Sequence, residues 1–337
     1  MKKSVIAALC AAAVAALGVP ALSGCSAKVN YILKTGDDGS HYYSVVTGGF
    51  SNYLDGEYVI PDYYGEGSSR YPVKEIEAQA FYNTSITKLT IPATIEKIGN
   101  AAFAHCEQLK EVVFEEGISI DAIAWGSFAY CKGLKNISIP DSVTTVDGLS
   151  FYNCPKLTTV ELPDGLERIN YRAFYNCTAL TDVTFPDNLI TIGKEAFFSC
   201  TSLERVVLPD GMHDVAVEGS EDVIPAIGTI AFSMCSRLKL AVLGEGITTI
   251  ESGVFGGCTS LETIYLPATL TKIKGNVADV YPHAFYATPS LVNVYFAGTE
   301  EEWQTVLSGI DDTVYGGVSD NSSVLNANKV FNTKYSG

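Results

Sequence analysis

The sequence predicts a solenoid, a stack of small repeated units, and three observations support that prediction. Phe and Cys occur together as Phe-x-x-Cys seven times between residues 103 and 258. The Phe residues of these pairs lie 25, 23, 23, 23, 35 and 23 positions apart. Phe81 and Phe285 extend the series at either end without the Cys. A period in the twenties is typical of repeats that stack on their neighbours.

Each copy of about 23 residues follows one frame, which the fifth copy illustrates. Ala173, Phe174 and Cys177 have the spacing of one helical turn with Phe and Cys pointing inward. Val183 and Phe185 then alternate as in a strand, which ends at a proline because proline cannot donate to a ladder. We therefore expect one short helical turn and one strand per copy, with the strands aligned in a parallel sheet. Stacking would bury a core column made of Phe103, Cys106, Phe128, Cys131, Phe151, Cys154, Phe174, Cys177, Phe197, Cys200, Phe232, Cys235, Phe255 and Cys258.

The cysteines are predicted to be buried free thiols. Seven of the nine occupy one position of the repeat, seven is an odd number, and stacked neighbours are equivalent. A small apolar side chain also suits a crowded core. Neighbouring thiols would lie about 5 Å apart, at the spacing of strands, so an occasional disulfide is the alternative. The sequence holds no C-x-x-C zinc spacing, and we expect no metal site and no catalytic thiol.

A hydrophobic residue followed by proline closes the strand in most copies. With the Ala-Phe-x-x-Cys turns, these pairs resemble the BspA-like class of bacterial leucine-rich repeats over roughly residues 73–298. The resemblance implies a curved, right-handed leucine-rich-repeat solenoid of about nine repeats. It also implies contacts with proteins or glycans at bacterial surfaces, often as an adhesin, and it brings no catalytic residue. The pairs are Ile91-Pro92, Ile139-Pro140, Leu162-Pro163, Phe185-Pro186, Leu208-Pro209 and Leu266-Pro267.

Residues 1–24 are predicted to be a lipoprotein signal peptide. Lys2 and Lys3 precede an apolar stretch that is too short to span a bilayer. The segment Leu22-Ser23-Gly24-Cys25 resembles the lipobox of bacterial lipoproteins, which implies cleavage before Cys25 and acylation of its thiol and new amino group. Two or three acyl chains would anchor the chain stably to a membrane. An ordinary signal peptide with a chance cysteine is the alternative.

Both ends of the stack are predicted to be capped, because a bare end would expose the core. Residues 25–72 would hold the anchor, a short linker and an N-terminal β cap with strands near Tyr31–Leu33, His41–Thr47 and Tyr58–Pro61. Residues 299–337 would form the C-terminal cap. There, a helix capped by Thr299 would run to Leu307 and bury Trp303. A loop at Ser308–Ser323 and a last strand within 324–334 would follow.

The outward side of the predicted strands contains an apolar stripe in its C-terminal half. The outward column comprises Thr90, Val113, Ser138, Glu161, Thr184, Val207, Val242, Tyr265 and Tyr295. Contiguous exposed apolar surface often marks an interface. We therefore predict a partner-binding face made of Val207, Leu240, Val242, Tyr265 and Tyr295. The alternatives are that these residues are only good strand formers, or that an insertion or the C-terminal tail covers them.

Two copies are longer than their neighbours. The sixth has 12 extra residues around Asp214–Pro225, and the eighth has 7 around Lys274–Pro282. Insertions in stacked repeats lie in loops, often on a functional face. The first insertion is acidic, so calcium is an alternative to a solvated loop, although the spacing matches no calcium-loop signature.

The charge of the chain argues against a nucleic-acid partner. Without Lys2 and Lys3 the 22 basic residues fall to 20 against 38 acidic ones, so the formal net charge moves from −16 to −18. We expect an exported, lipid-anchored, monomeric binding protein of the bacterial cell surface, without catalysis or cofactor, that recognises a host or bacterial surface protein or a glycan. The alternative is a structural subunit of a cell-envelope assembly. A remote alternative is a glycan-active enzyme, with Glu161 and Asp182 as its carboxylate pair.

Overall fold

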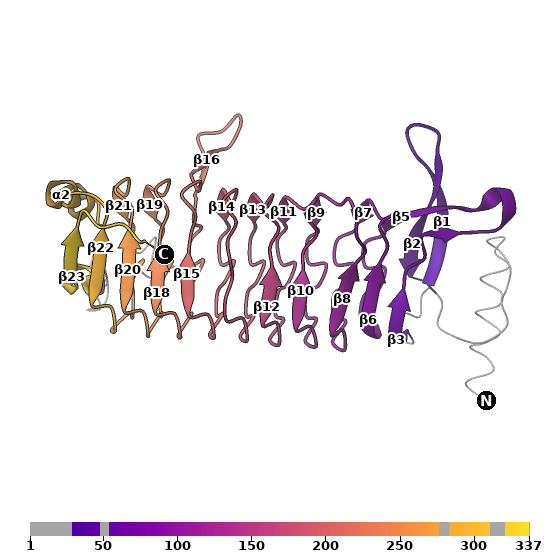
Figure 1. The fold of residues 1–337 in the computed structure, drawn as a ribbon, viewed down its shortest axis with the longest axis horizontal. Helices are drawn as coiled ribbons and strands as arrows, with labels where there is room; N and C mark the ends of the chain where they lie inside the picture. Colours follow the sequence, from indigo (N-terminus) through magenta and orange to yellow (C-terminus); the bar gives the residue numbers. More distant parts are fainter. Residues whose placement is uncertain (1–28, 48–53, 276–282, 311–320, 337) are drawn as a thin grey trace.

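The chain forms an elongated stack of short parallel strands, with the N-terminal strands at one end of the stack and the last strand at the other (Figure 1). The computed structural model describes residues 29–47, 54–275, 283–310 and 321–336. The predicted signal peptide and Cys25 lie outside the described residues, as does most of the insertion in the eighth copy.

The N-terminal region is a small sheet that adds to the N-terminal end of the stack. Strands β1 (Val29–Thr35) and β2 (His41–Thr47) form an antiparallel hairpin, and β2 pairs in parallel with β5 (Tyr71–Ile76). The short β4 (Tyr63–Tyr64) and the 3-10 turn η2 (Gly67–Ser69) lead into β5. The first two predicted strands are therefore present in this region, the first of them longer than expected.

One strand from most repeats lies in a first parallel ladder along the stack. Three sheets make up this ladder, and Thr159 and Asp182 form an isolated bridge in the gap between the second and third. In the fifth repeat, Val183 and Phe185 are buried as predicted but form no strand. The ladder contains β3 (Asp55–Val59), β6 (Ser85–Ile91), β8 (Glu111–Phe114), β10 (Asn136–Ser138), β12 (Thr159–Glu161), β15 (Arg205–Val207), β18 (Leu240–Val242), β20 (Thr263–Leu266), β22 (Asn293–Phe296) and β23 (Asn328–Phe331).

A second parallel ladder, which was not predicted from the sequence, runs beside the first. Apart from β5, its strands hold only two residues each, one outward and one buried apolar residue in most cases, which is too short for a visible alternation. Each lies where the chain returns inward before the next Phe turn. After β5, the ladder continues with β7 (Lys97–Ile98), β9 (Ala122–Ile123), β11 (Thr145–Val146), β13 (Arg168–Ile169), β14 (Thr191–Ile192), β19 (Thr249–Ile250) and β21 (Lys272–Ile273).

The Phe-x-x-Cys segments are turns, so the predicted helical turn is wrong. In most of these turns, the residues two before and two after the Phe have positive φ, as at Leu149 (58°) and Asn153 (58°) around Phe151. Because residues with positive and negative φ alternate, every second N–H points toward the neighbouring turn in the stack. Phe151, for example, donates to the carbonyl of Ala173 in the next repeat at 2.8 Å. The turns therefore form a third hydrogen-bonded row along the stack.

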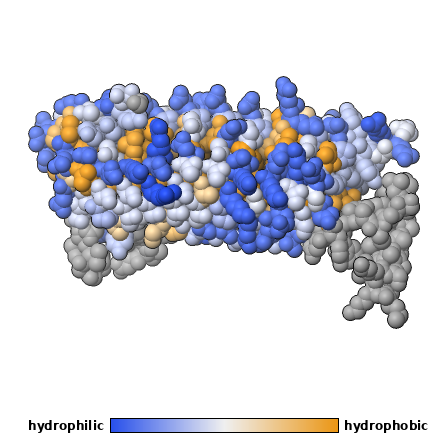
Figure 2. Space-filling view, turned by 60° about the horizontal axis from the view of Figure 1, so that its bottom comes forward, coloured by the Kyte–Doolittle hydropathy of each residue, from blue (hydrophilic) through white to orange (hydrophobic). Residues whose placement is uncertain are grey.

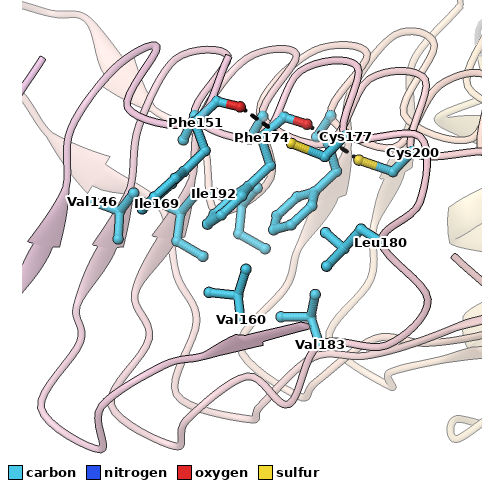
Figure 3. Packing of buried hydrophobic residues seen from close by; sticks show 14 of the residues in the cluster. Val146, Phe151, Val160, Ile169, Phe174, Cys177, Leu180, Val183, Ile192 and Cys200 are labelled. Carbon is cyan, nitrogen blue, oxygen red and sulfur yellow. Dashed lines mark hydrogen bonds between the residues drawn. The ribbon is translucent and has the colours of Figure 1, made fainter. Parts of the chain in front are cut away.

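The interior is a continuous apolar column, as the repeat pattern predicts. The Phe rings from Phe81 to Phe285 stack with centroids 5.1 to 6.0 Å apart. Each Cys thiol donates to the carbonyl oxygen of the Phe in the preceding repeat; Figure 3 shows Cys177 bonding to Phe151 and Cys200 to Phe174, each at 3.2 Å. All fourteen residues of the predicted core column are buried.

The C-terminal region packs against the last repeat. Helix α2 (Glu300–Ser308) begins after Thr299, which forms a capping box with Glu302, and it buries Trp303, so the predicted helix is present. A second short helix, α3 (Ser322–Asn326), was not predicted and precedes β23. The side chain of its first flanking residue, Asn321, is buried and accepts a hydrogen bond from Phe285 N–H. In the other repeats, the N–H of the corresponding Phe donates to a backbone carbonyl of the next turn.

Candidate partner-binding face

The structure brings four of the five predicted face residues into one row. Across β15, β18, β20 and β22, Val207 pairs with Val242, Val242 with Tyr265, and Tyr265 with Tyr295. Val330 of β23 continues the row beyond Tyr295. Leu240 lies on the neighbouring row, opposite Arg205 and Thr263. The Phe repeat therefore gave the correct register for the outward side of these strands.

Tyr265 and Tyr295 are the centre of this row. Their rings stack with centroids 4.6 Å apart and planes 12° apart, and both side chains are half-buried. Burial raises the pKa of the Tyr265 hydroxyl, and the neighbouring hydroxyls of Tyr295 and Tyr335 raise it further. Val242, predicted to be exposed, is only 7% exposed. The row is therefore a partly covered aromatic surface rather than a bare stripe.

The C-terminal tail supplies part of that cover. After β23 the chain reverses at Asn332, whose φ is +56°, and the Thr333 N–H then donates to the Phe296 carbonyl at 3.3 Å. The tail runs back along the stack and ends near β18 (Figure 1). Tyr335 meets Tyr265 edge to face, with ring centroids 5.1 Å apart and planes 69° apart. The alternative in which the tail covers the stripe is therefore correct for this part of it.

An acidic pair lies beside the aromatic pair. The ammonium of Lys334 lies 2.7 Å from the Glu245 carboxylate, and the Glu245 N–H donates to Asp210 Oδ1 at 3.0 Å. The hydrogen bond to Glu245 raises the pKa of Lys334, and the charges of Glu245 and Asp210 add to this effect. The sequence offered no signal for this contact, because Lys334 and Tyr335 lie outside the repeat, although Glu245 occupies the repeat position that Asp210 holds in the preceding copy.

The wider surface alternates between polar and apolar areas. Figure 2 shows separate apolar areas along the stack, one of them at the end that holds the last repeats. The sixth-copy insertion forms a hairpin of β16 (Val215–Ala216) and β17 (Val223–Ile224) that rises out of the stack (Figure 1). Val223 and Ile224 are exposed on this hairpin.

The column cysteines are unsuited to chemistry. All seven are free and fully buried. Burial raises the pKa of the Cys106 thiol to about 11 and those of Cys177 and Cys235 to about 12. Because the thiolate is the reactive form, these groups are structural donors at neutral pH.

Glu161 and Asp182, the carboxylates of the remote enzyme alternative, lie on neighbouring segments of the first ladder. Asp182 bridges to Thr159, whereas Glu161 pairs with Ser138, so the two carboxylates are offset by two residues along their strands. Within the described ranges, no group of His, Cys, Asp or Glu is arranged to hold a metal ion. Among the same residues, no helix is long and apolar enough to cross a membrane.

A row of aromatic side chains on the turn side was also missed. Its neighbouring rings lie 4.4 to 5.3 Å apart. The repeated Phe-Tyr-Asn triplet was a visible signal for part of this row. Its members are Tyr82, His105, Tyr130, Tyr152, Tyr175 and Phe198.

The repeat frame and its parallel ladders agree with a known family. The family model of the BspA type leucine rich repeat region matches residues 74–146, 117–219, 151–278 and 216–305, which together cover more than half of the chain. The chain belongs to this BspA type leucine-rich-repeat family. Proteins of the family are generally surface-binding proteins, and leucine-rich repeats generally mediate protein binding.

Solved structures of leucine-rich-repeat proteins resemble the chain distantly. A leucine rich cell surface protein of Faecalibacterium prausnitzii is 22% identical, with 85% of this chain and 97% of that chain covered and a TM-score of 0.42. A leucine rich repeat protein of T. pallidum is 24% identical over 69% and 78% of the two chains, with a TM-score of 0.34. The pneumococcal vaccine antigen PcpA is 15% identical over 85% and 97%, with a TM-score of 0.42. No curated protein matches the chain, so the family assignment rests on the repeat match.

Proposed function

We propose that this BspA type repeat protein is a lipid-anchored, monomeric binding protein of the bacterial cell surface. Its partner is a host or bacterial surface protein or a glycan, and it performs no catalysis. The partner docks on the outward face of β15, β18, β20 and β22, around Tyr265 and Tyr295. The observation that supports this proposal most strongly is the stacked tyrosine pair, which stands half-exposed in register between Val242 and Val330.

The chemistry of this face suits recognition. Tyrosine provides a large apolar area with a polar tip and loses little conformational entropy on binding, and it is enriched where interfaces hold most of their energy. The middle of the outward column, from Ser138 to Thr184, is exposed and polar. Most of the buried side chains in the described stack are Phe, Cys and aliphatic groups. Binding through the C-terminal strands therefore uses the one part of the column in which large side chains gather.

Partner capture with matched variants tests the proposed face. The full-length chain, a Tyr265→Ser/Tyr295→Ser variant and a Tyr82→Ser/Tyr286→Ser control are presented to host and bacterial surface extracts. The control removes two exposed tyrosines from the turn side of the stack. We expect a partner that the native chain and the control retain and that the Tyr265→Ser/Tyr295→Ser variant loses by at least tenfold. Equal retention by all three chains, with intact circular dichroism, would reject the proposed face.

The anchor is tested separately. The lipobox-like segment ending at Cys25 and the acyl chains it implies support the lipid-anchor proposal. Cys25→Ser should move the protein from the detergent phase to the aqueous phase in a phase-partition assay and abolish incorporation of labelled fatty acid. Unchanged partition would reject the anchor.

The competing structural role predicts a different solution state. A subunit of an envelope assembly would use the same face as a permanent interface. Light scattering after size exclusion distinguishes the two, because the binding protein is expected to be a monomer whereas the assembly subunit would be an oligomer.

A further inference from the structure

We propose that the acidic and aromatic groups around Glu245 and Tyr265 form a binding site for a peptide segment in which lysine stands next to an aromatic residue. The chain's own C-terminal tail, residues 332–336, occupies this site and masks it. The inference rests on the proposed function, because it assigns a ligand class and a form of regulation to the same face.

The tail contacts the acidic and aromatic groups of the face as a bound peptide would. Beyond the turn at Asn332, two adjacent side chains make the distinctive contacts. Lys334 places its ammonium 2.7 Å from the Glu245 carboxylate, and Tyr335 sets its ring against Tyr265 at 5.1 Å. A lysine-tyrosine pair therefore fits the spacing between the acidic and aromatic parts of the face.

Charge explains why a basic segment is favoured. Glu245 has Asp210 next to it, and both contribute to holding Lys334 protonated. The exported chain has a formal net charge of −18 once Lys2 and Lys3 are removed, so a cationic ligand is attracted at long range. The stacked Tyr265 and Tyr295 supply a ring surface for the aromatic side chain. An acidic segment would meet repulsion at the same place.

The contacts that hold the tail are weak enough for a ligand to displace it. The Lys334 side chain is 70% exposed, and an ion pair this exposed is weak in water and is screened by salt. A single edge-to-face ring contact is also modest. The tail competes mainly through its tether, which gives a short segment an effective concentration on the order of millimolar. A partner with more contacts than the tail can therefore replace it.

A labelled peptide tests the site directly. The probe is a synthetic peptide with the sequence of residues 332–337, Asn-Thr-Lys-Tyr-Ser-Gly, and its binding to full-length chains is followed by fluorescence anisotropy. We expect a Lys334→Ser/Tyr335→Ser variant to bind the probe about tenfold more tightly than the native chain, because a site occupied nine-tenths of the time loses a factor of about ten in apparent affinity. Rising salt should weaken this binding.

Matched changes identify the groups involved. In the tail variant, adding Glu245→Gln or Tyr265→Ser should abolish probe binding, whereas adding Lys132→Ser or Tyr286→Ser should leave it unchanged. A probe with serine in place of both lysine and tyrosine should not bind. The proposal is overturned if the tail variant binds no probe, if native and tail-variant chains bind it equally, or if the serine probe binds as well. Thermal melting by circular dichroism verifies that each variant is folded.

The outcomes separate this inference from the proposed function. If the tail variant gains no affinity but Tyr265→Ser/Tyr295→Ser still abolishes partner capture, the masking is wrong and the proposed face stands. If probe binding follows the expected pattern while partner capture ignores both tyrosines, the peptide site is correct and the proposed function is wrong.

Discussion

At the residue scale, the repeated cysteine acts as a hydrogen-bond donor between repeats. The Sγ to carbonyl oxygen distances run from 3.0 to 3.3 Å along the column, and each bond joins one repeat to the Phe of the one before. The two end repeats, which have no Cys, carry threonine at the same position. Thr84 lies 3.1 Å from Cys106 Sγ, and Thr288 donates to the Phe285 carbonyl at 2.8 Å. The position therefore holds a small side chain that forms a hydrogen bond, although only the cysteine form is seen donating to the preceding repeat.

A Cys177→Thr variant tests this role through pH. The pKa of Cys177 is raised to about 12 by burial, whereas an unfolded thiol ionises near pH 8.5. Above pH 8.5 the native state therefore binds more protons than the unfolded state, so the stability from this thiol is complete below pH 8.5 and is lost as pH rises toward 12. Each buried thiol contributes a slope of about 1.4 kcal/mol per pH unit, so one thiol accounts for about 1.4 kcal/mol by pH 9.5.

Urea unfolding between pH 7 and 9.5 measures this difference, because the seven buried thiols together would unfold the chain at higher pH. The free energy of unfolding should fall with pH less steeply for the variant than for the native chain, and the two slopes should differ by the contribution of one thiol. Reductant is present throughout. Lys and Tyr titrations affect both chains alike and cancel in the comparison. Parallel curves for the two chains would show that the thiol is not a buried donor.

At the scale of elements, the turn and the short strands explain where sequence reasoning failed. A Cys three residues after a Phe points inward together with it in a helical turn. The same spacing also turns both side chains inward where residues with negative and positive φ alternate, so the spacing does not distinguish the two conformations. Positive φ is costly for side chains such as Leu149 and Ile230, so no local preference pointed to it. The lateral hydrogen bonds to the next turn offset that cost, and they exist only in the stack. By contrast, α2 was predictable because Thr299 and Glu302 form its capping box locally.

Two glycines at the same repeat position test how closely neighbouring turns approach. Gly165 and Gly246 each lie four residues after the last residue of a strand, β12 and β18 respectively. A Cβ on Gly246 would collide with the Met212 carbonyl, whereas a Cβ on Gly165 would meet its nearest atom, the Asp141 carbonyl, at 3.7 Å. We expect Gly246→Ala to lower the free energy of unfolding by about 1–3 kcal/mol and Gly165→Ala to change it by about 0.5 kcal/mol or less.

Chemical denaturation of the two variants, side by side, measures the contrast. The same substitution in the same kind of turn should have unequal effects only if the sixth and seventh repeats pack more tightly than the third and fourth. Equal effects would contradict the close approach at Gly246.

At the scale of the whole molecule, the repeat specifies an inert interior and leaves function to the outside. The period was enough to predict the parallel strands, the buried Phe and Cys column and the row from Val207 to Tyr295, because every copy repeats the same inward positions. The period could not predict where the C-terminal tail packs. Lys334 and Tyr335 occur once, outside the period, and they meet Glu245 and Tyr265 only after the last strand has added to the ladder and the chain has reversed at Asn332.

Zero-length carbodiimide cross-linking followed by mass spectrometry tests whether this tail occupies the binding face. The reagent joins an ammonium and a carboxylate that are in contact, and the Lys132–Glu107 pair, also 2.7 Å apart and exposed, serves as an internal control. We predict cross-links for both Lys132–Glu107 and Lys334–Glu245, the second weakening as the tail-sequence peptide is added. A cross-link at Lys132–Glu107 with none at Lys334–Glu245 would contradict the account.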